Sequence, residues 1–472
     1  MFRVLFIKEV RDHLLSLRVA IGLSLGILLV AASAFVLSSI HLARQQEMAG
    51  NQQRQVELLA HYAHANRIWS FLRSTTRPPA PIVLVQGLDQ EDGAETLMSN
   101  PMPELFPVMD LAWSVAIILS LFAIVIGFDA FNGEKERGTL RLLLANRVSR
   151  LQVAAAKWTA GAFVLTVALT GALLVGVLIV QIRANTVWDG DEWFSMLVLG
   201  LLSAVYCWAF FSAAFAASAI FSRSSVSVLA SLFTWILLVL VIPSVSPYVA
   251  AQFVPLSSSA AMERDLQYML SEERDQIGKA RVEEVRKKYA SILPLEGLSE
   301  SDIQGRIHRD PEFKRIYAQR AQEIDQIWDD VNAEQRVKAD RLTADHDARA
   351  RRQFELSRTL SLFSPLPAYL YATTELSATG FGTWEEFDRQ MRGWRQSMTD
   401  YLASRYEAEK RADPTFGVND FIDVSTRPRF QFQFPSFADR FAASAGYAGE
   451  LCVWVFLLVG LAMAQFARFD VR

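Results

Sequence analysis

Long uncharged stretches alternate with charged ones along the chain. Six windows rich in Leu, Val, Ile, Ala and Phe contain no Asp, Glu, Lys or Arg: residues 19–43, 111–128, 158–182, 193–222, 224–262 and 451–467. A helix that crosses the hydrocarbon layer of a bilayer needs roughly 20 apolar residues, and a charge at its centre costs about 2.5–3.5 kcal/mol. The pattern therefore predicts six transmembrane helices in an all-α polytopic membrane protein.

Lys and Arg are distributed unevenly between the segments that join these windows. Residues 1–18 carry four of them and residues 132–158 carry six, and two more stand in the tail after residue 467. On the opposite side, residues 183–192 carry one, and residues 44–107 carry only five over a much longer stretch. Because positively charged loops stay inside, both termini and the loop 131–158 are expected in the cytoplasm.

The windows and this orientation predict the domain organisation. Five segments are expected: an amino-terminal interfacial (elbow) helix with the first span (1–41), an extracytoplasmic segment (42–107), spans two to five with the cytoplasmic loop 131–158 (108–253), an extracytoplasmic helical domain (254–445), and the sixth span with a cytoplasmic tail (446–472).

The second extracytoplasmic segment has the composition of a water-exposed domain. Residues 254–445 hold 28 Lys and Arg and 32 Asp and Glu, more than half of all charged side chains in the chain. Within it, residues 311–360 lack internal Pro and Gly and have apolar positions at helical spacing, as does the stretch 260–292. Two long helices packed as an antiparallel hairpin are expected. A charged helix pair with one apolar seam is favoured over a coiled coil with another chain.

The first eighteen residues have the pattern of an interfacial helix. Phe2, Phe6, Val10, Leu14 and Leu17 share one helical face, and most of the charged residues lie elsewhere. A basic amphipathic helix directly before a span is suited to lie in the cytoplasmic membrane interface.

The cytoplasmic loop 131–158 has the most distinctive sequence of the chain, FNGEKERGTLRLLLANRVSRLQVAAAKW. Gly133 and Gly138 interrupt it, and Thr139 is a plausible cap for a short Leu-rich helix. Ser149 is a plausible cap for the helix that leads into the third span. A short amphipathic helix is thus presented to the cytoplasm.

This loop resembles that of the transmembrane subunits of type-two (ABC-2) ABC exporters. Their loop reads Glu-x-Glu-x-Gly-Thr-Leu, a Leu-rich helix, Pro-Val-Ser-Arg and a downstream Gly-Lys. The chain differs by having Arg147 in place of Pro and Ala156 in place of Gly. The matching residues are Glu134, Glu136, Gly138, Thr139, Leu140, Leu142 to Leu144, Val148, Ser149, Arg150 and Lys157.

The resemblance implies a permease subunit in the bacterial cytoplasmic (inner) membrane. In that family the loop is a coupling helix that docks in a groove of a separate ATPase subunit, and two permease subunits pair as a homodimer or heterodimer. By analogy Glu134, Glu136, Leu140 and Leu143 face the ATPase, Gly138 and Thr139 set the turn, and Arg150 lies at the membrane surface. The alternative is a positively charged loop that only anchors two spans. The outer segment 254–445 resembles the large insertions of one subgroup.

ATP itself is expected on the partner subunit and not on this chain. A phosphate-binding loop needs Gly-x4-Gly-Lys-Ser/Thr, and the string from Gly133 to Thr139 lacks the Lys. No cofactor, bound metal or nucleic-acid partner is predicted. His61 and His64, with Met98 and Met102, are a weak candidate for a soft-metal site.

Gly22 and Gly26 form a Gly-x3-Gly pair in the first span, which permits close helix approach. They predict either the seam of a permease dimer or packing within one subunit.

Two functions share these cytoplasmic features. The first is substrate transport, most simply export, driven by the ATPase. The second is a mechanical transmitter that relays ATPase motion to an extracytoplasmic protein without transporting a substrate. A cavity between paired subunits would favour the first function, and tightly packed spans with a long rigid outer stalk would favour the second.

Overall fold

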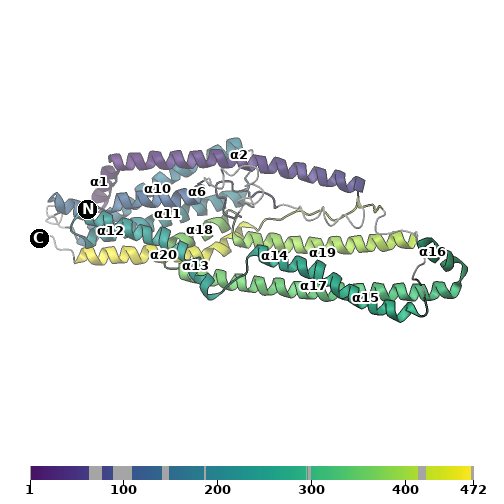
Figure 1. The fold of residues 1–472 in the computed structure, drawn as a ribbon. Coiled ribbons are helices and arrows are strands. Elements are labelled where there is room, and N and C mark those ends of the chain that lie inside the picture. Colours follow the sequence, from purple (N-terminus) through teal and green to yellow (C-terminus); the bar gives the residue numbers. More distant parts are fainter. Residues whose placement is uncertain are drawn as a thin grey trace. The chain divides into compact units, whose positions relative to one another are not determined.

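The structure is a computed structural model (Figure 1). It describes residues 2–62, 77–88, 109–140, 148–184, 188–293, 295, 299–412 and 421–468, except for the side chains of residues 55–62, 259, 300, 301 and 304. The elements assigned in these ranges are helices. Among the described residues, six helices are long and apolar enough to cross a membrane, so the predicted six spans and the all-α class are confirmed.

The chain divides into two compact units. Unit one comprises residues 1–243 and 361–472, and unit two comprises residues 244–360. Unit two is shorter than the predicted outer segment 254–445 because the helices that follow it belong to unit one. The extracytoplasmic location of that segment stays a prediction.

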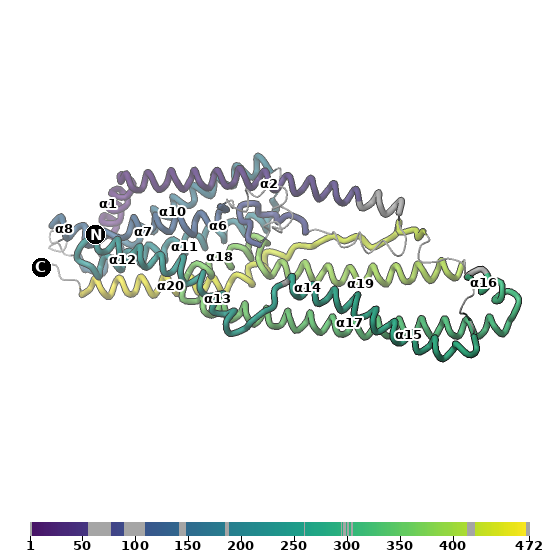
Figure 2. The backbone as a smooth tube through the Cα atoms, in the orientation of Figure 1, coloured from purple at the N-terminus to yellow at the C-terminus, as the bar shows by residue number. Residues whose placement is uncertain are grey.

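Unit one holds the spans except for the end of the fifth, which continues past residue 243 into unit two. Figure 2 traces the backbone. The first span lies in a helix that continues well past the predicted boundary at residue 41, and the sixth begins before the predicted boundary at 446. The helices are α1 (Phe2–Leu14), α2 (Leu17–Tyr62), α6 (Leu111–Ser114), the π-helical turn η1 (Val115–Leu119), α7 (Ser120–Gly127), α8 (Asn132–Glu136), α10 (Arg150–Arg183), α11 (Gly190–Ile220), α12 (Ser224–Trp235), the π-helical turn η2 (Ile236–Val241), α13 (Ile242–Phe253, which runs into unit two), α18 (Pro365–Leu376), α19 (Phe381–Ala412) and α20 (Phe437–Ala467).

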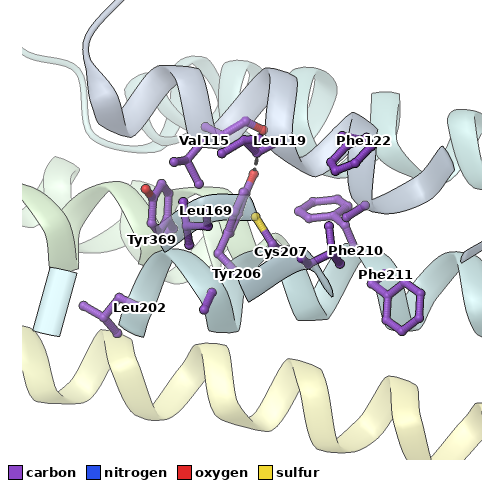
Figure 3. Close-up of a cluster of buried hydrophobic side chains, with 14 of the residues drawn as sticks. Val115, Leu119, Phe122, Leu169, Leu202, Tyr206, Cys207, Phe210, Phe211 and Tyr369 are labelled. Carbon is purple, nitrogen blue, oxygen red and sulfur yellow. Dashed lines mark hydrogen bonds between the residues drawn. The ribbon is translucent and has the colours of Figure 1, made fainter. Parts of the chain in front are cut away.

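Helix α11 is the centre of this unit and contacts α7, α10, α12, α18 and α20. Its apolar side chains form a buried cluster with η1 and α18, in which Tyr206 and Tyr369 stack with ring centroids 4.4 Å apart (Figure 3). The Tyr206 hydroxyl donates to the Ala116 carbonyl at 3.1 Å, so its polar atom is satisfied inside the core.

Local sequence explains where the third and fourth spans begin. Ser149 and Gln152 form a reciprocal capping box at the start of α10, and Asp189 and Glu192 form another at the start of α11. Each box satisfies backbone N–H groups that have no partner within the helix. The predicted cap at Ser149 is therefore confirmed.

Unit two is a helical hairpin, as expected. It contains α14 (Ser259–Tyr268), η3 (Met269–Glu273), α15 (Arg274–Ala290), α16 (Glu300–Arg309) and α17 (Pro311–Ser361). Three ion pairs join its two long arms: Glu273 with Lys338, Arg281 with Glu334 and Lys288 with Glu323. Residue numbers rise along one arm as they fall along the other, so the arms are antiparallel.

Candidate functional site

The first part of the loop 131–158 folds as one helical turn followed by a sharp turn. Helix α8 covers Asn132–Glu136, and Gly138 follows with φ +74°. That backbone conformation costs other L-residues roughly 1–2 kcal/mol, so the glycine sets the turn. The Thr139 hydroxyl donates to the Glu134 carbonyl at 3.3 Å. Leu142 to Leu144 and Arg147 lie outside the described residues, and so does the predicted Leu-rich helix.

A buried triad of charges links this loop to two other helices. The Lys157 ammonium on α10 lies 3.0 Å from Glu9 Oε2 on α1 and 2.9 Å from Glu134 Oε1 on α8. The three residues are 5%, 7% and 6% exposed. The half-exposed Lys8 approaches the same carboxylates, at 3.3 Å from Glu9 and 3.6 Å from Glu134. Buried charges are tolerated when they are paired in this way.

Two of these charged groups, Glu9 and Lys8, are held in their ionised forms by their neighbours. Burial by itself raises the pKa of Glu9, but Lys157 and Lys8 outweigh it and hold the pKa of this carboxyl below its ordinary value. For Lys8, burial lowers the pKa, and the neighbouring Glu9 and Glu134 outweigh this and raise it. Both groups are therefore charged at neutral pH.

The second carboxylate of the motif binds a different helix. Glu136 accepts hydrogen bonds from the Ser224 backbone N–H at 2.8 Å and from the Ser224 hydroxyl at 3.0 Å. Ser224 is the first residue of α12, and the preceding Arg223 makes no side-chain cap. A carboxylate at a helix N-terminus satisfies a free N–H group and interacts favourably with the helix dipole. Glu136 thus caps the fifth span from the loop.

Polar and aromatic contacts attach the loop to two more spans. The Phe131 N–H donates to Ser218 Oγ at 2.9 Å near the end of α11, and Asn132 Oδ1 accepts from the same hydroxyl at 3.3 Å. The Phe131 ring stacks on Phe466 of α20 with centroids 3.9 Å apart. Together with the triad and the cap, these contacts connect residues 131–136 to α1, α10, α11, α12 and α20.

The predicted loop residues therefore fall into two groups. Residues 136–139 are exposed, whereas Glu134 and Leu140 are buried at 6% and 1% exposure. These two side chains face the interior of the chain because Glu134 pairs with Lys157 and Leu140 joins the apolar core. Arg150 donates to the Ala467 carbonyl at 3.0 Å, at the last residue of α20. Leu143 lies outside the described residues, and contact of any of these residues with an ATPase stays a prediction.

Gly22 and Gly26 face the second span of the same chain. A Cβ at Gly22 would come within 2.1 Å of the Phe122 ring, and one at Gly26 within 3.0 Å of the Leu119 side chain. Of the two interpretations left open by the sequence, packing within one subunit has this geometric support.

Sequence reasoning missed Glu9 as a site residue, although two signals were present. Glu9 follows Phe6 by three positions, which places it beside the apolar face of the first helix. Lys157 is the one charged residue between Arg150 and Arg183, the two ends of its helix, and an ionisable residue in such a place calls for a partner.

The remaining weak candidate cannot be placed. Of the proposed soft-metal ligands, His64, Met98 and Met102 lie outside the described residues, and so does the side chain of His61. In the part of the chain that the structure describes, no group of three or more His, Cys, Asp or Glu side chains is arranged to hold a metal ion.

Comparison with known proteins agrees with this architecture. A search of curated proteins returned no match. A family model described as ABC-2 family transporter protein matches residues 3–471. With six membrane-spanning helices and a match over nearly its whole length, the chain belongs to the ABC-2 transporter family and is a membrane permease component of an ABC transporter.

Proposed function

We propose that this permease converts ATP hydrolysis by a separate cytoplasmic ATPase subunit into substrate export across the bacterial cytoplasmic membrane. Both termini and the loop 131–158 lie in the cytoplasm in this proposal, and a second permease subunit, identical or related, completes the membrane part. ATP is bound by the ATPase. The observation that carries the proposal is the set of contacts by which one short loop segment holds five helices of unit one.

The loop is built to transmit displacement. Glu134 and Glu136 belong to the same helical turn, and they bind the Glu9–Lys157 pair and the start of α12. Moving α8 without its neighbours would separate a buried ion pair, which costs about 3–5 kcal/mol when one partner is left behind. A force applied to the loop is therefore passed to α1, α10 and α12 together.

The burial of Glu134 and Leu140 changes which residues offer a contact surface. We assign the direct ATPase contact to the exposed turn, residues 136–139, with Leu143 as a further contact residue. Glu134 then acts through its internal ion pairs and not through the partner's surface. The carboxylate of Glu136 has a double role, because it is exposed and still caps α12.

Copurification of the native complex tests this assignment. The permease is isolated from membranes, its ATPase is identified by mass spectrometry, and the bound ATPase is quantified for Thr139→Arg. Because Thr139 is exposed, the long charged side chain should leave insertion and folding intact while blocking the groove of the ATPase. The matched control is Thr399→Arg, the same change at an exposed position of α19. Wild-type recovery of the ATPase with Thr139→Arg would refute the assignment.

A mechanical transmitter is the second candidate, and unit two favours it. Helix α17 has 51 residues, which is about 77 Å at 1.5 Å per residue, and three ion pairs fasten it to the opposite arm. A long rigid hairpin suits a stalk that acts on an extracytoplasmic protein. Crosslinking from residues 244–360 distinguishes the two candidates: capture of one specific protein in an ATP-dependent manner favours transmission, whereas ATP-driven release of a bound small molecule favours transport.

A further inference from the structure

A charged cavity lies beside the buried triad. Its volume is about 540 Å³, within the usual range for small-molecule sites. It is bounded by the end of α1, the start of α2, the end of α7 and the loop that follows it. Its lining residues are Glu9, Asp12, His13, Leu15, Ser16, Arg18, Val19, Val125, Ile126, Asp129, Ala130, Glu134, Arg137, Lys157 and Phe211.

The polar part of the lining holds both signs of charge. Arg18 and Asp129 form an ion pair at 2.8 Å and are half and one-third exposed, so both are within reach of a ligand. Deeper in the lining, Glu134 is nine-tenths buried, and its Oε2 atom has no hydrogen-bond partner in the described part of the chain. A buried carboxylate oxygen without a donor is costly, and it adds uncompensated negative charge to the inner wall of the cavity.

Acidic and basic side chains balance around this cavity. Four carboxylates and the cations Arg18, Arg137 and Lys157 line it, and Lys8 adds a fourth cation beside three of those carboxylates. The remaining titratable group, His13, has its pKa lowered by burial, so at neutral pH it adds no positive charge. A lining with both signs of charge suits a ligand that has both a phosphate and an ammonium group.

The other part of the lining is apolar and continuous with the lipid-facing surface. Leu15 and Val19 come from the junction of α1 and α2, and Val125, Ile126 and Phe211 come from the spans. Leu15 is 74% exposed, and its neighbour Leu17 is 73% exposed. Exposed leucines beside a charged cavity at the end of an interfacial helix mark the depth at which lipid headgroups meet acyl chains.

We propose that this cavity binds the headgroup of a phospholipid with a primary ammonium, a phosphatidylethanolamine of the adjoining leaflet. The phosphate is bound by Arg18 and Arg137. The ammonium donates to the carboxylates of Asp12 and Asp129 and approaches Glu134, and the acyl chains lie over Leu15 and Leu17. A choline headgroup lacks the N–H donors that these carboxylates require, and a glycerol headgroup lacks the positive charge.

The headgroup lies between α1, the first two spans and the loop. A bound lipid therefore holds α1 in the position where its Glu9 pairs with Lys157 of α10. The lipid site shares Arg137 with the turn assigned to the ATPase, and its other residues lie outside that turn. Loss of lipid binding would leave the assignment of residues 136–139 standing, and the reverse also holds.

Native mass spectrometry of the purified permease tests the proposal. The delipidated protein is incubated with equal amounts of dioleoyl phosphatidylethanolamine, phosphatidylcholine and phosphatidylglycerol, and retained lipid is measured at rising collision energy. The ethanolamine lipid should be retained at least tenfold more than either of the others. Asp129→Asn should reduce this preference tenfold or more, because it removes an acceptor for the ammonium. Arg137→Gln should reduce retention of the ethanolamine lipid tenfold or more, because it removes a contact with the phosphate. The matched controls are Asp388→Asn and Arg392→Gln, the same changes in an exposed ion pair on α19.

Two further measurements keep the test decisive. Thermal unfolding midpoints and elution profiles show whether each variant is folded, and Arg137→Gln, at an exposed site, serves as the test variant if Asp129→Asn is not folded. Soluble phosphoethanolamine is added as a competitor to separate a lipid from a free headgroup. Equal retention of the three lipids, an unchanged preference in folded Asp129→Asn, unchanged retention of the ethanolamine lipid in folded Arg137→Gln, or competition by phosphoethanolamine at the concentration of the lipid would each overturn the proposal.

Discussion

Removing the central cation of the buried triad should destabilise unit one strongly. Lys157→Met keeps the length and apolar stem of the side chain but leaves Glu9 and Glu134 without their closest partner. At an effective dielectric constant of 20, each contact near 3 Å contributes about 5–6 kcal/mol of attraction before desolvation is subtracted. Breaking a buried pair of this kind is measured at about 3–5 kcal/mol, and we expect a loss in that range.

The remaining lysine limits the loss without abolishing it. Lys8 lies 3.3 Å from Glu9 and 3.6 Å from Glu134, but its side chain is 47% exposed, so solvent screens its attraction. The two carboxylates would share one screened partner in Lys157→Met, and protonation of one of them is the expected response. The stability of the variant should therefore recover partly as the pH falls toward 5, whereas that of the wild type should not rise.

Equilibrium unfolding in mixed micelles measures the loss of stability, and hydrogen exchange of the α1 amides is the signal that monitors it. The triple variant Glu9→Gln, Glu134→Gln, Lys157→Met replaces all three charges and should regain much of the lost stability, because burying neutral amides costs less than burying unpaired carboxylates. A double-mutant cycle between Glu9→Gln and Lys157→Met should show coupling of at least about 1 kcal/mol. Additive effects below about 1 kcal/mol would show that the triad is not a coupled unit, and the reasoning would fail.

Three further outcomes are expected. Acidification should loosen α1 in two steps. Burial lowers the pKa of His13, so this residue stays neutral in the folded state while the unfolded state takes up a proton, and stability falls as the pH drops below about 6.5. The pKa of Glu9 is also lowered in the folded state, so protonation of the unfolded state adds a second loss below about pH 4.3. Hydrogen exchange of α1 between about pH 7.5 and pH 3, corrected for intrinsic rates, measures both steps. A first step that persists in His13→Gln would contradict the assignment. Gly138→Ala should cost about 1–2 kcal/mol in unfolding measurements because φ is +74°, while Gly393→Ala, in an open helical position, should be neutral or stabilising. Gly22→Ala should destabilise the protein by about 1–3 kcal/mol because the added methyl group collides with the Phe122 ring, and Phe122→Leu should partly restore the loss. Gly171→Ala, at a position with free space around it, is the control. Equal effects of the two glycine changes would refute the packing of Gly22 on Phe122.

Periodicity and charge were sufficient to predict the architecture. Each uncharged window became a span, because the desolvation cost of a charge leaves a strong one-dimensional signal. The antiparallel hairpin of unit two followed equally from apolar spacing, and the cap at Ser149 followed from the local chemistry of the helix start. These features are determined by residues close together in the sequence.

The arrangement of the site could not be predicted in the same way. Lys157 and Glu9 are separated by 148 positions, and Glu136 and Ser224 by 88. The resemblance to ABC-2 exporters led to the prediction that Glu134 faces an ATPase, and therefore lies on the surface. Glu134 faces inward because Lys157, buried where α1 packs on α10, gives its carboxylate a partner inside the protein.

The spacing of the two glutamates explains how one short helix serves two partners. Residues two apart on an α-helix point about 200° away from each other, so a Glu-x-Glu pair cannot address one neighbour. On α8 this geometry sends Glu134 inward to Lys157 and turns Glu136 toward the start of α12. A rotation of α8 about its axis would disturb both contacts at once, whereas a translation that carries all its neighbours would disturb neither. A helix held in this way resists turning and favours moving as a body with the ends of the spans, which is the motion that a coupling element needs.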